Sequence, residues 1–418
     1  MRLLGIGTPG PSMEQTLNPP HRSAIALTAL AYIPSVLSMM PVGVLVPFID
    51  ALSRDLAATP PQLGLAIALF SVPSAILATL GGGLIDRYGV RRSLLSAAAA
   101  LILGSVLASQ VHSLLALDCA MVVSGLGFAG ICVGAPCLVM ATLRNGVRTR
   151  SMALCSTFAP TGYAGGLLLA VPFTDSGDWR TAFLAHAAMM TVAFGALLLF
   201  VPNVASVIGE SRGSMRQTFA NMLSVIREPR ALRLAVAIAL PNAVSYGTSL
   251  AVPSYLARVH HLTIAHSSAT VAFAKLAAMI IGGLSMGYLL SRQVRISLLF
   301  AFMVATGLLA QTILFLPASG MTLATVALML WLFSFGGMAG GGMTLLPTVV
   351  RDPARSGAAS GLVNQAISIV SFATPSTWLA LHSGMQYVLL ATVCLLISLI
   401  ALPASGAASS NQATPAVV

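Results

Sequence analysis

A single lysine lies in the middle of a long apolar segment of this 418-residue sequence. Lys275 stands within AFAKLAAMI at 272–280, and the surrounding stretch 265–290 is long enough to cross a bilayer as a helix. The lysine lies about ten residues, or about 15 Å, inside that helix. A cation at this depth costs about 2.5–3.5 kcal/mol on insertion scales, so Lys275 must face water, a ligand or a partner group.

The usual partner of a lysine inside a membrane is a carboxylate. None of the ten acidic residues is expected near the centre of a span, and Asp50 and Asp118 come closest, at the outer ends of two spans. An ammonium without a counter-charge offers a point charge and three donors, which suits a substrate anion. The alternative is a structural lysine that donates to carbonyls at a helix break.

Other polar side chains within apolar segments are candidates to line a cavity. Asn242 and Tyr246 share one helical face with Ser245 and Ser249, between two prolines. The remaining candidates for contact with a substrate are Tyr32, Trp331, Asn364 and Gln365. Each of these side chains could instead hydrogen-bond a neighbouring helix. His186, in the apolar run FLAHAAMM, is interpreted as a packing residue rather than a proton relay.

The composition indicates an all-α integral membrane protein. Hydrophobic residues make up 57% of the chain and charged residues 7%, with a mean hydropathy of +0.92, whereas soluble domains carry about 25% charged residues. A spanning helix satisfies its backbone polar groups internally, so each apolar stretch of about 20 residues is expected to be a transmembrane helix. The sequence contains twelve such stretches. The expected spans are 23–48, 62–84, 93–110, 115–142, 151–173, 181–201, 231–257, 265–290, 296–316, 321–349, 357–380 and 385–402.

The net charge of +11 reflects topology rather than nucleic-acid binding. If loops are assigned alternately to the two sides, seventeen of the twenty arginines share the side of the N-terminus, and only Arg54, Arg180 and Arg258 lie opposite. This positive-inside pattern predicts that both termini are cytoplasmic. Twenty arginines against one lysine, with abundant alanine, are typical of a GC-rich bacterial genome, so we expect the bacterial inner membrane.

The chain divides into two similar halves. We expect an N-terminal tail at 1–22, a six-helix bundle at 23–201, a cytoplasmic loop at 202–230, a second six-helix bundle at 231–402 and a tail at 403–418. GLGFAGICVGAP (125–136) and GGMAGGGMTLLP (336–347) align without a gap, which indicates pseudo-symmetric bundles. Paired halves with a substrate between them are a recurring plan of secondary transporters.

The segment GGGLIDRYGVRRSLL (81–95), between the second and third spans, resembles the loop signature of the major facilitator superfamily. The matching residues are Gly83, Asp86, Arg87, Gly89, Arg91 and Arg92. In that family the acid and its basic neighbours latch the cytoplasmic side in one conformation. The resemblance therefore implies a gating role for Asp86, Arg87 and Arg91, while the alternative is a set of cytoplasmic anchors.

The fifth span contains APTGYAGG (159–166), which partly resembles the signature of drug/proton antiporters of the same family. Pro160, Gly162 and Gly166 carry the match, although no glycine precedes the proline. The same residues equally suit a helix kink and a surface for close helix packing.

The sequence favours a secondary transporter that moves a small solute by alternating access. An organic or inorganic anion is the expected substrate, with proton symport and anion exchange both open, and a proton-coupled drug or metabolite exporter is the alternative. GLSMG (283–287) matches a hydrolase nucleophile motif but lies within an apolar helix, so we expect no enzyme. We expect no cofactor, no metal and a monomer in the lipid bilayer.

Overall fold

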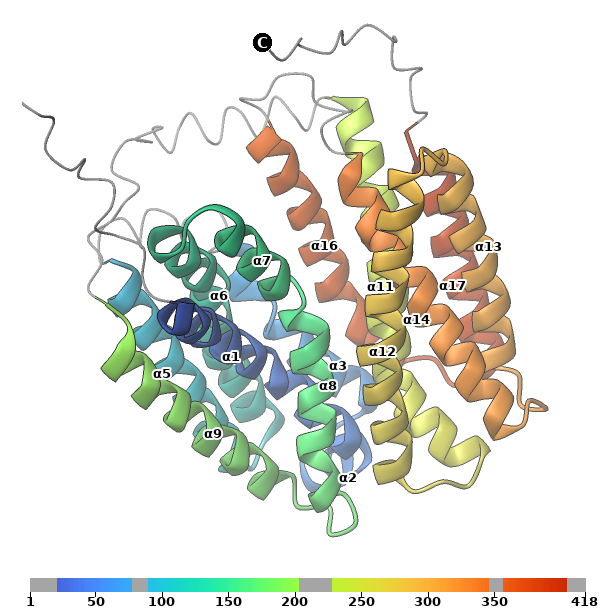
Figure 1. The fold of residues 1–418 in the computed structure, drawn as a ribbon. Helices are drawn as coiled ribbons and strands as arrows, with labels where there is room; N and C mark the ends of the chain where they lie inside the picture. The colour runs from blue at the N-terminus through green and yellow to red at the C-terminus, as the bar shows by residue number, and fades with distance from the viewer. Residues whose placement is uncertain (1–20, 77–88, 203–227, 346–355, 404–418) are drawn as a thin grey trace, which may run out of the picture.

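The computed structural model describes residues 21–76, 89–202, 228–345 and 356–403, and within these ranges the chain forms helices and no β-strand (Figure 1). Nine of the described helices are long and apolar enough to cross a membrane. Gly146–Cys155 and Phe158–Phe173, bent by 44°, would together form a tenth span, and Pro60–Ile76 is a shorter apolar helix at the place of the second predicted span. The all-α membrane class is confirmed.

The helices lie where hydropathy places them. We use first half for residues 21–202 and second half for residues 228–403. The first half contains α1 (His21–Leu45), η1 (Val46–Phe48), α2 (Ile49–Asp55), α3 (Pro60–Leu69), α5 (Val90–Ser109), α6 (Leu114–Thr142), α7 (Asn145–Cys155), α8 (Phe158–Ala170), η2 (Val171–Phe173) and α9 (Trp179–Phe200). The second half contains α11 (Pro229–Val259), α12 (Ile264–Ser291), α13 (Ile296–Leu314), α14 (Met321–Thr344), α16 (Ser356–Leu379) and α17 (Gly384–Ala401).

Helices that begin on the predicted outer side start at polar caps. Ser113, Asp178, Thr263 and Ser383 each accept a backbone N–H from three residues further on, at N···O distances of 3.1 to 3.3 Å. These caps satisfy donors that a helix leaves free at its N-terminus. Hydrogen bonds from the side chain and backbone of Thr181 lower the pKa of the Asp178 carboxyl, so this cap stays ionised at a helix end that favours negative charge.

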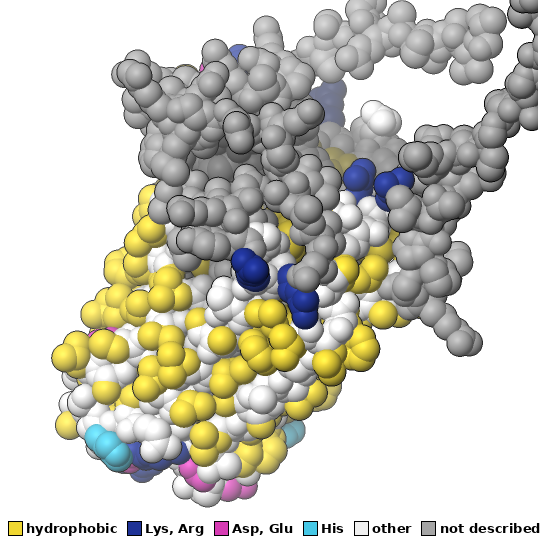
Figure 2. Space-filling view, turned by 90° about the vertical axis from the view of Figure 1, so that its left-hand side faces the viewer, with side chains coloured by type: hydrophobic (Ala, Val, Ile, Leu, Met, Phe, Trp, Pro, Cys, Tyr) yellow, Lys and Arg dark blue, Asp and Glu magenta, His cyan; other side chains and the backbone are white. Residues whose placement is uncertain are grey.

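The outer face of the first half is apolar, as a bilayer requires. Figure 2 shows a broad band of hydrophobic side chains between charged groups near its two ends. On α9, Val192, Leu199 and Phe200 are 67–76% exposed. Exposure of so many large apolar side chains marks contact with lipid rather than with water.

The two predicted repeats use equivalent glycines for equivalent approaches. Gly125 in α6 lies against the backbone carbonyl of Phe70, and Gly336 in α14 lies against the carbonyl of Met279 in α12. Phe70 is the C-cap of α3, which lies in the second predicted span, and α12 is the eighth. The fourth helix of each set of six therefore packs on the second through a glycine, and this contact supports the internal repeat.

The halves meet mainly at the predicted outer side. The η1 and η2 segments contact α11 or α12 there, α8 packs on α12, and α3 packs on α16. Gly64 in α3 lies so close to Pro375 and Ser376 in α16 that a Cβ atom would come within 2.7 Å of their backbone. Figure 1 shows the halves converging near α2 and diverging towards α7 and the start of α16. The expected domain boundaries stay a prediction, because residues 203–227 lie outside the described ranges.

Candidate functional site

Lys275 points from α12 into the junction between the two halves. The opposite face of the helix carries Phe273, Ile281 and Leu284, which are 55–69% exposed, whereas Lys275 is only 7% exposed. Its Nζ donates to Ser249 Oγ on α11 at 2.8 Å, and Ser249 Oγ donates to the Ser245 carbonyl at 2.7 Å. The helical period thus places the Lys275 ammonium on the face of α12 that points away from lipid and towards Ser245 and Ser249 of α11.

Tyr163 of α8 completes this cluster from the first half. The Lys275 ammonium lies 4.4 Å from the centroid of the Tyr163 ring, in a cation–π arrangement. The Tyr163 hydroxyl donates to the Ser249 carbonyl at 2.7 Å. Tyr246 also lies on α11, three residues before Ser249. Sequence reasoning missed Tyr163, although it lies inside the glycine-rich segment that was singled out.

No carboxylate pairs with Lys275 within the described part of the chain. The ion pair found there joins Arg180 to Asp55, 3.6 Å apart at the predicted outer side, where Trp179 Nε1 also donates to Asp55 at 2.9 Å. One hydroxyl and one aromatic face are weak compensation for a buried positive charge. Among the described residues, Lys275 therefore has no counter-charge, and Ser249 takes one of its three donors.

The other predicted site residues are spread over several places. Asn242 lies half-buried on α11, one turn before Tyr246. On α16, Asn364 is exposed and Gln365 is half-buried. The structure does not bring Trp331 to the cluster, because its fully buried ring packs on Gly307 of α13 within the second half.

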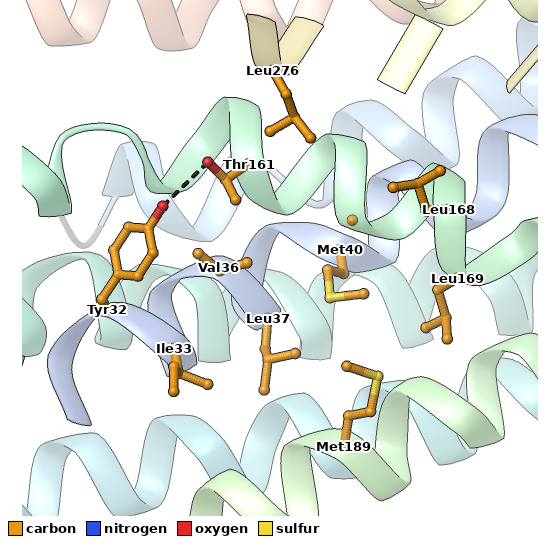
Figure 3. A pocket seen from close by; sticks show the side chains of 11 residues that line it. Tyr32, Ile33, Val36, Leu37, Met40, Thr161, Leu168, Leu169, Met189 and Leu276 are labelled. Carbon is orange, nitrogen blue, oxygen red and sulfur yellow. Dashed lines mark hydrogen bonds between the residues drawn. The ribbon is translucent and has the colours of Figure 1, made fainter. Parts of the chain in front are cut away.

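Tyr32 lines a separate cavity, shown in Figure 3. The cavity has a volume of about 550 Å³ and is formed by α1, α8 and α9, with Leu276 contributed by α12. The Tyr32 hydroxyl lies 3.0 Å from Thr157 Oγ1 and donates to Thr161 Oγ1 at 3.2 Å. The rest of the lining is apolar and includes Met40 and Met189.

The loop-motif residues are only partly described. Gly83, Asp86 and Arg87 lie outside the described residues. Gly89 precedes α5 with φ at +80°, a conformation that favours glycine. Arg91 donates to the Leu198 carbonyl near the end of α9 at 2.6 Å, where a cation is favoured, and Arg92 is exposed.

The span-five residues form a kink and a packing surface. Pro160 lies in the first turn of α8, just after the 44° bend from α7, where its missing N–H costs little. Gly162 lies against the Val36 carbonyl, and Gly166 lies against the Met40 carbonyl. A Cβ atom added to Gly166 would also lie 2.8 Å from Gly43 Cα. These contacts let α8 and α1 touch through their backbones.

His186 makes two buried hydrogen bonds between helices of the first half. Its Nε2 lies 2.9 Å from the Leu37 carbonyl of α1, and its Nδ1 lies 2.7 Å from Ser105 Oγ of α5. A carbonyl only accepts, so Nε2 carries the hydrogen and Nδ1 accepts from the serine. This satisfied arrangement supports the interpretation of His186 as a packing residue.

We expect His186→Leu to lower the free energy of unfolding by about 1–3 kcal/mol, because the Leu37 carbonyl loses its donor. Transport per folded molecule should stay unchanged. Thermal unfolding and flux in vesicles measure the two effects, and the exposed His112→Leu is the control that should alter neither. A loss of flux without a loss of stability would instead make His186 a relay.

Comparison with known proteins places this geometry in a family. The sequence model of the Major Facilitator Superfamily matches residues 31–375. A probable plastidic glucose transporter of Arabidopsis thaliana is 29% identical over 126 residues, which are 30% of this chain and 24% of that protein. The inner membrane transport protein YajR of Escherichia coli is 25% identical over 196 residues, 47% of this chain and 42% of that protein. The chain thus matches less than half the length of these curated relatives.

Solved structures share the fold over nearly the whole chain. A mutant of the nucleoside transporter NupG superposes with a TM-score of 0.73 at 11% identity, covering 90% of this chain and 98% of that one. A bacterial homologue of the human lysosomal transporter Spinster, in an inward-facing and unoccupied conformation, gives 0.70 at 14% identity, covering 92% and 95%. Identities this low show the fold alone.

Proposed function

Since the chain belongs to the major facilitator superfamily, we propose that it carries a small organic or inorganic anion across the membrane by alternating access. Transport of a solute follows from the family. The anion, the rocking of the two halves and the coupling are the proposal, and proton symport and anion exchange are both compatible with it. We further propose a monomer in the bacterial inner membrane with both termini in the cytoplasm.

The observation that carries the proposal is the uncompensated charge of Lys275 at the junction of the halves. Its ammonium has three donors, of which Ser249 takes one, and no carboxylate of the described residues pairs with it. A bound anion would supply the missing counter-charge and lower the cost of burial. Because the site touches α8, α11 and α12, it lies where the two halves meet.

A screen of solutes against the purified protein tests the substrate class. The measurement is thermal unfolding in detergent with small carboxylates, inorganic anions and lipophilic cations. We expect stabilisation by at least one anion, since a ligand that binds the folded state stabilises it by mass action. Stabilisation by lipophilic cations alone would contradict the anion proposal.

The exporter alternative is favoured by one separate observation, the apolar cavity of Figure 3. Its methionine and aliphatic walls are pliable and suit a lipophilic solute, and it lies beside the glycine-rich segment of α8. In the screen, this alternative predicts stabilisation by lipophilic drugs that a Tyr32→Leu change would weaken.

We propose that Asp86, with Arg87 and Arg91, gates the predicted cytoplasmic side. Asp86→Asn should reduce transport in reconstituted vesicles by an order of magnitude or more and leave expression and thermal stability unchanged, because the change removes a charge without changing side-chain size. Asp175→Asn, in an outer loop, is the matched control. Near-normal flux in Asp86→Asn would reduce these residues to membrane anchors.

A further inference from the structure

Three prolines inside the described helices leave backbone carbonyls that receive donors from other helices. A proline has no N–H, so the carbonyl four residues earlier loses its helical donor. The residues freed in this way are Leu37 by Pro41, Ala237 by Pro241 and Ser249 by Pro253. An unpaired carbonyl within a bilayer is costly, and each of these three is paired by a remote side chain.

Two of the three pairings each join helices of a single half. His186 of α9 lies 2.9 Å from the Leu37 carbonyl in the first half, and Ser398 of α17 donates to the Ala237 carbonyl at 2.6 Å in the second. Helices of one half would move together in a rocking motion, so alternating access of this kind would keep both hydrogen bonds.

The third pairing crosses between the halves. Tyr163 belongs to α8 in the first half, and the Ser249 carbonyl belongs to α11 in the second. Among the side-chain hydrogen bonds of the described residues, this is the one that joins the two halves. The fully buried Tyr163 ring also faces the Lys275 ammonium of α12.

We propose that Tyr163 is the positioning residue that latches the two halves together while the predicted outer side is closed. Its hydroxyl satisfies the carbonyl freed by Pro253 only while α8 lies close enough for the Tyr163 side chain to reach α11. Opening of the outer side moves the Tyr163 hydroxyl from α11, leaves that carbonyl without a donor and takes the ring from Lys275. Beside the helix packing between the halves, the closed state therefore gains two contacts that are lost on opening, one hydroxyl and one ring, both on Tyr163.

The latch rests on the alternating-access part of the proposed function and not on the identity of the solute. In the closed state the ring and Ser249 both contact Lys275 and compensate its charge in part. Once Tyr163 has moved away, Lys275 presents its charge with less compensation, and the affinity for an anion should rise.

Distance measurements between the halves test the latch without any added solute. Spin labels at Ser176→Cys and His261→Cys report the separation at the predicted outer side, where both residues are exposed. The five native cysteines are replaced first, and the full chain is reconstituted in lipid vesicles. We expect Tyr163→Phe, which keeps the ring and loses the donor, to raise the ratio of long to short distances about tenfold, because a buried carbonyl loses its partner.

The matched control is Ser398→Ala, which removes the same type of hydrogen bond within one half. It should lower thermal stability and leave the distances unchanged. Pro253→Ala gives a second route, since it returns a backbone donor to the Ser249 carbonyl; it should favour the long distance by itself and abolish the further effect of Tyr163→Phe. Equal distances in wild type, Tyr163→Phe and Pro253→Ala would overturn the latch.

The outcomes separate the latch from the function on which it rests. If every variant shows both distances and Tyr163→Phe does not increase the population of the longer one, the latch alone is contradicted. A single distance under all conditions contradicts alternating access as well. Failure of every anion to stabilise the protein contradicts the substrate class and leaves the distance result unaffected.

Discussion

Lys275→Met is expected to abolish anion binding and to leave a folded protein. The variant removes the cation that the described residues place at the junction, so an anion loses its counter-charge. Wild type at an anion concentration about 100 times Kd should gain about 2.7 kcal/mol of stability, and the variant should gain none. The measurement is thermal unfolding with the anion found in the screen, followed by uptake into vesicles.

The protein should tolerate this change because no group is left unpaired. Ser249 Oγ still donates to the Ser245 carbonyl, and the methionine sulfur would meet the Tyr163 ring, which is a favourable contact. Without ligand, the variant should be as stable as wild type or more so, since a desolvated charge is gone. Arg292→Met, at the exposed end of the same helix, is the control for loss of charge. Anion binding that survives in Lys275→Met would place the site elsewhere, and failure to fold would make Lys275 structural.

Gly166→Ala is expected to lower the free energy of unfolding by about 1–3 kcal/mol and to reduce the yield of folded protein. Its Cβ would lie 2.8 Å from Gly43 Cα and 2.9 Å from Val44 N, and closer still to the Met40 carbonyl. All of these atoms belong to the backbone of α1, so the two helices must separate. Thermal unfolding in detergent measures the loss.

The neighbouring Gly165→Ala is the matched control. An added Cβ there comes no closer than 3.7 Å to the flexible Met40 side chain, an ordinary contact. This change should be neutral or slightly stabilising, because alanine favours helix more than glycine does. Equal stability of the two variants would show that α1 and α8 are not in backbone contact, and it would favour a gating role for Gly166 over packing.

The fold could largely be predicted from the sequence because a membrane restricts the spanning segments to apolar helices of about 20 residues. A helix such as α12 needs only its apolar composition to be recognised, and its observed bounds, Ile264–Ser291, differ from the expected 265–290 by one residue at each end. The family resemblance rested on a loop motif and is confirmed by a match over residues 31–375. The site residues depend instead on which helices are neighbours, and hydropathy carries no such information.

Tyr163 illustrates what the sequence could not provide. Pro253 indicates that the Ser249 carbonyl lacks its helical N–H donor, but the sequence does not indicate that the replacement donor comes from α8. Trp331, as a polar group within a span, was a candidate for substrate contact, and its ring packs on Gly307 inside the second half. The assignment of the site residues stays a prediction.

The isolation of Lys275 has a practical consequence for chemical labelling. In this sequence the sole side-chain amine is that of Lys275, and at 7% exposure it is shielded by Tyr163 and Ser249. A membrane-permeant, amine-selective reagent would therefore modify one internal position, and only in molecules whose junction has opened. Mass spectrometry of the peptide between Arg258 and Arg292 would count those molecules, so the native chain carries its own reporter of conformational exchange.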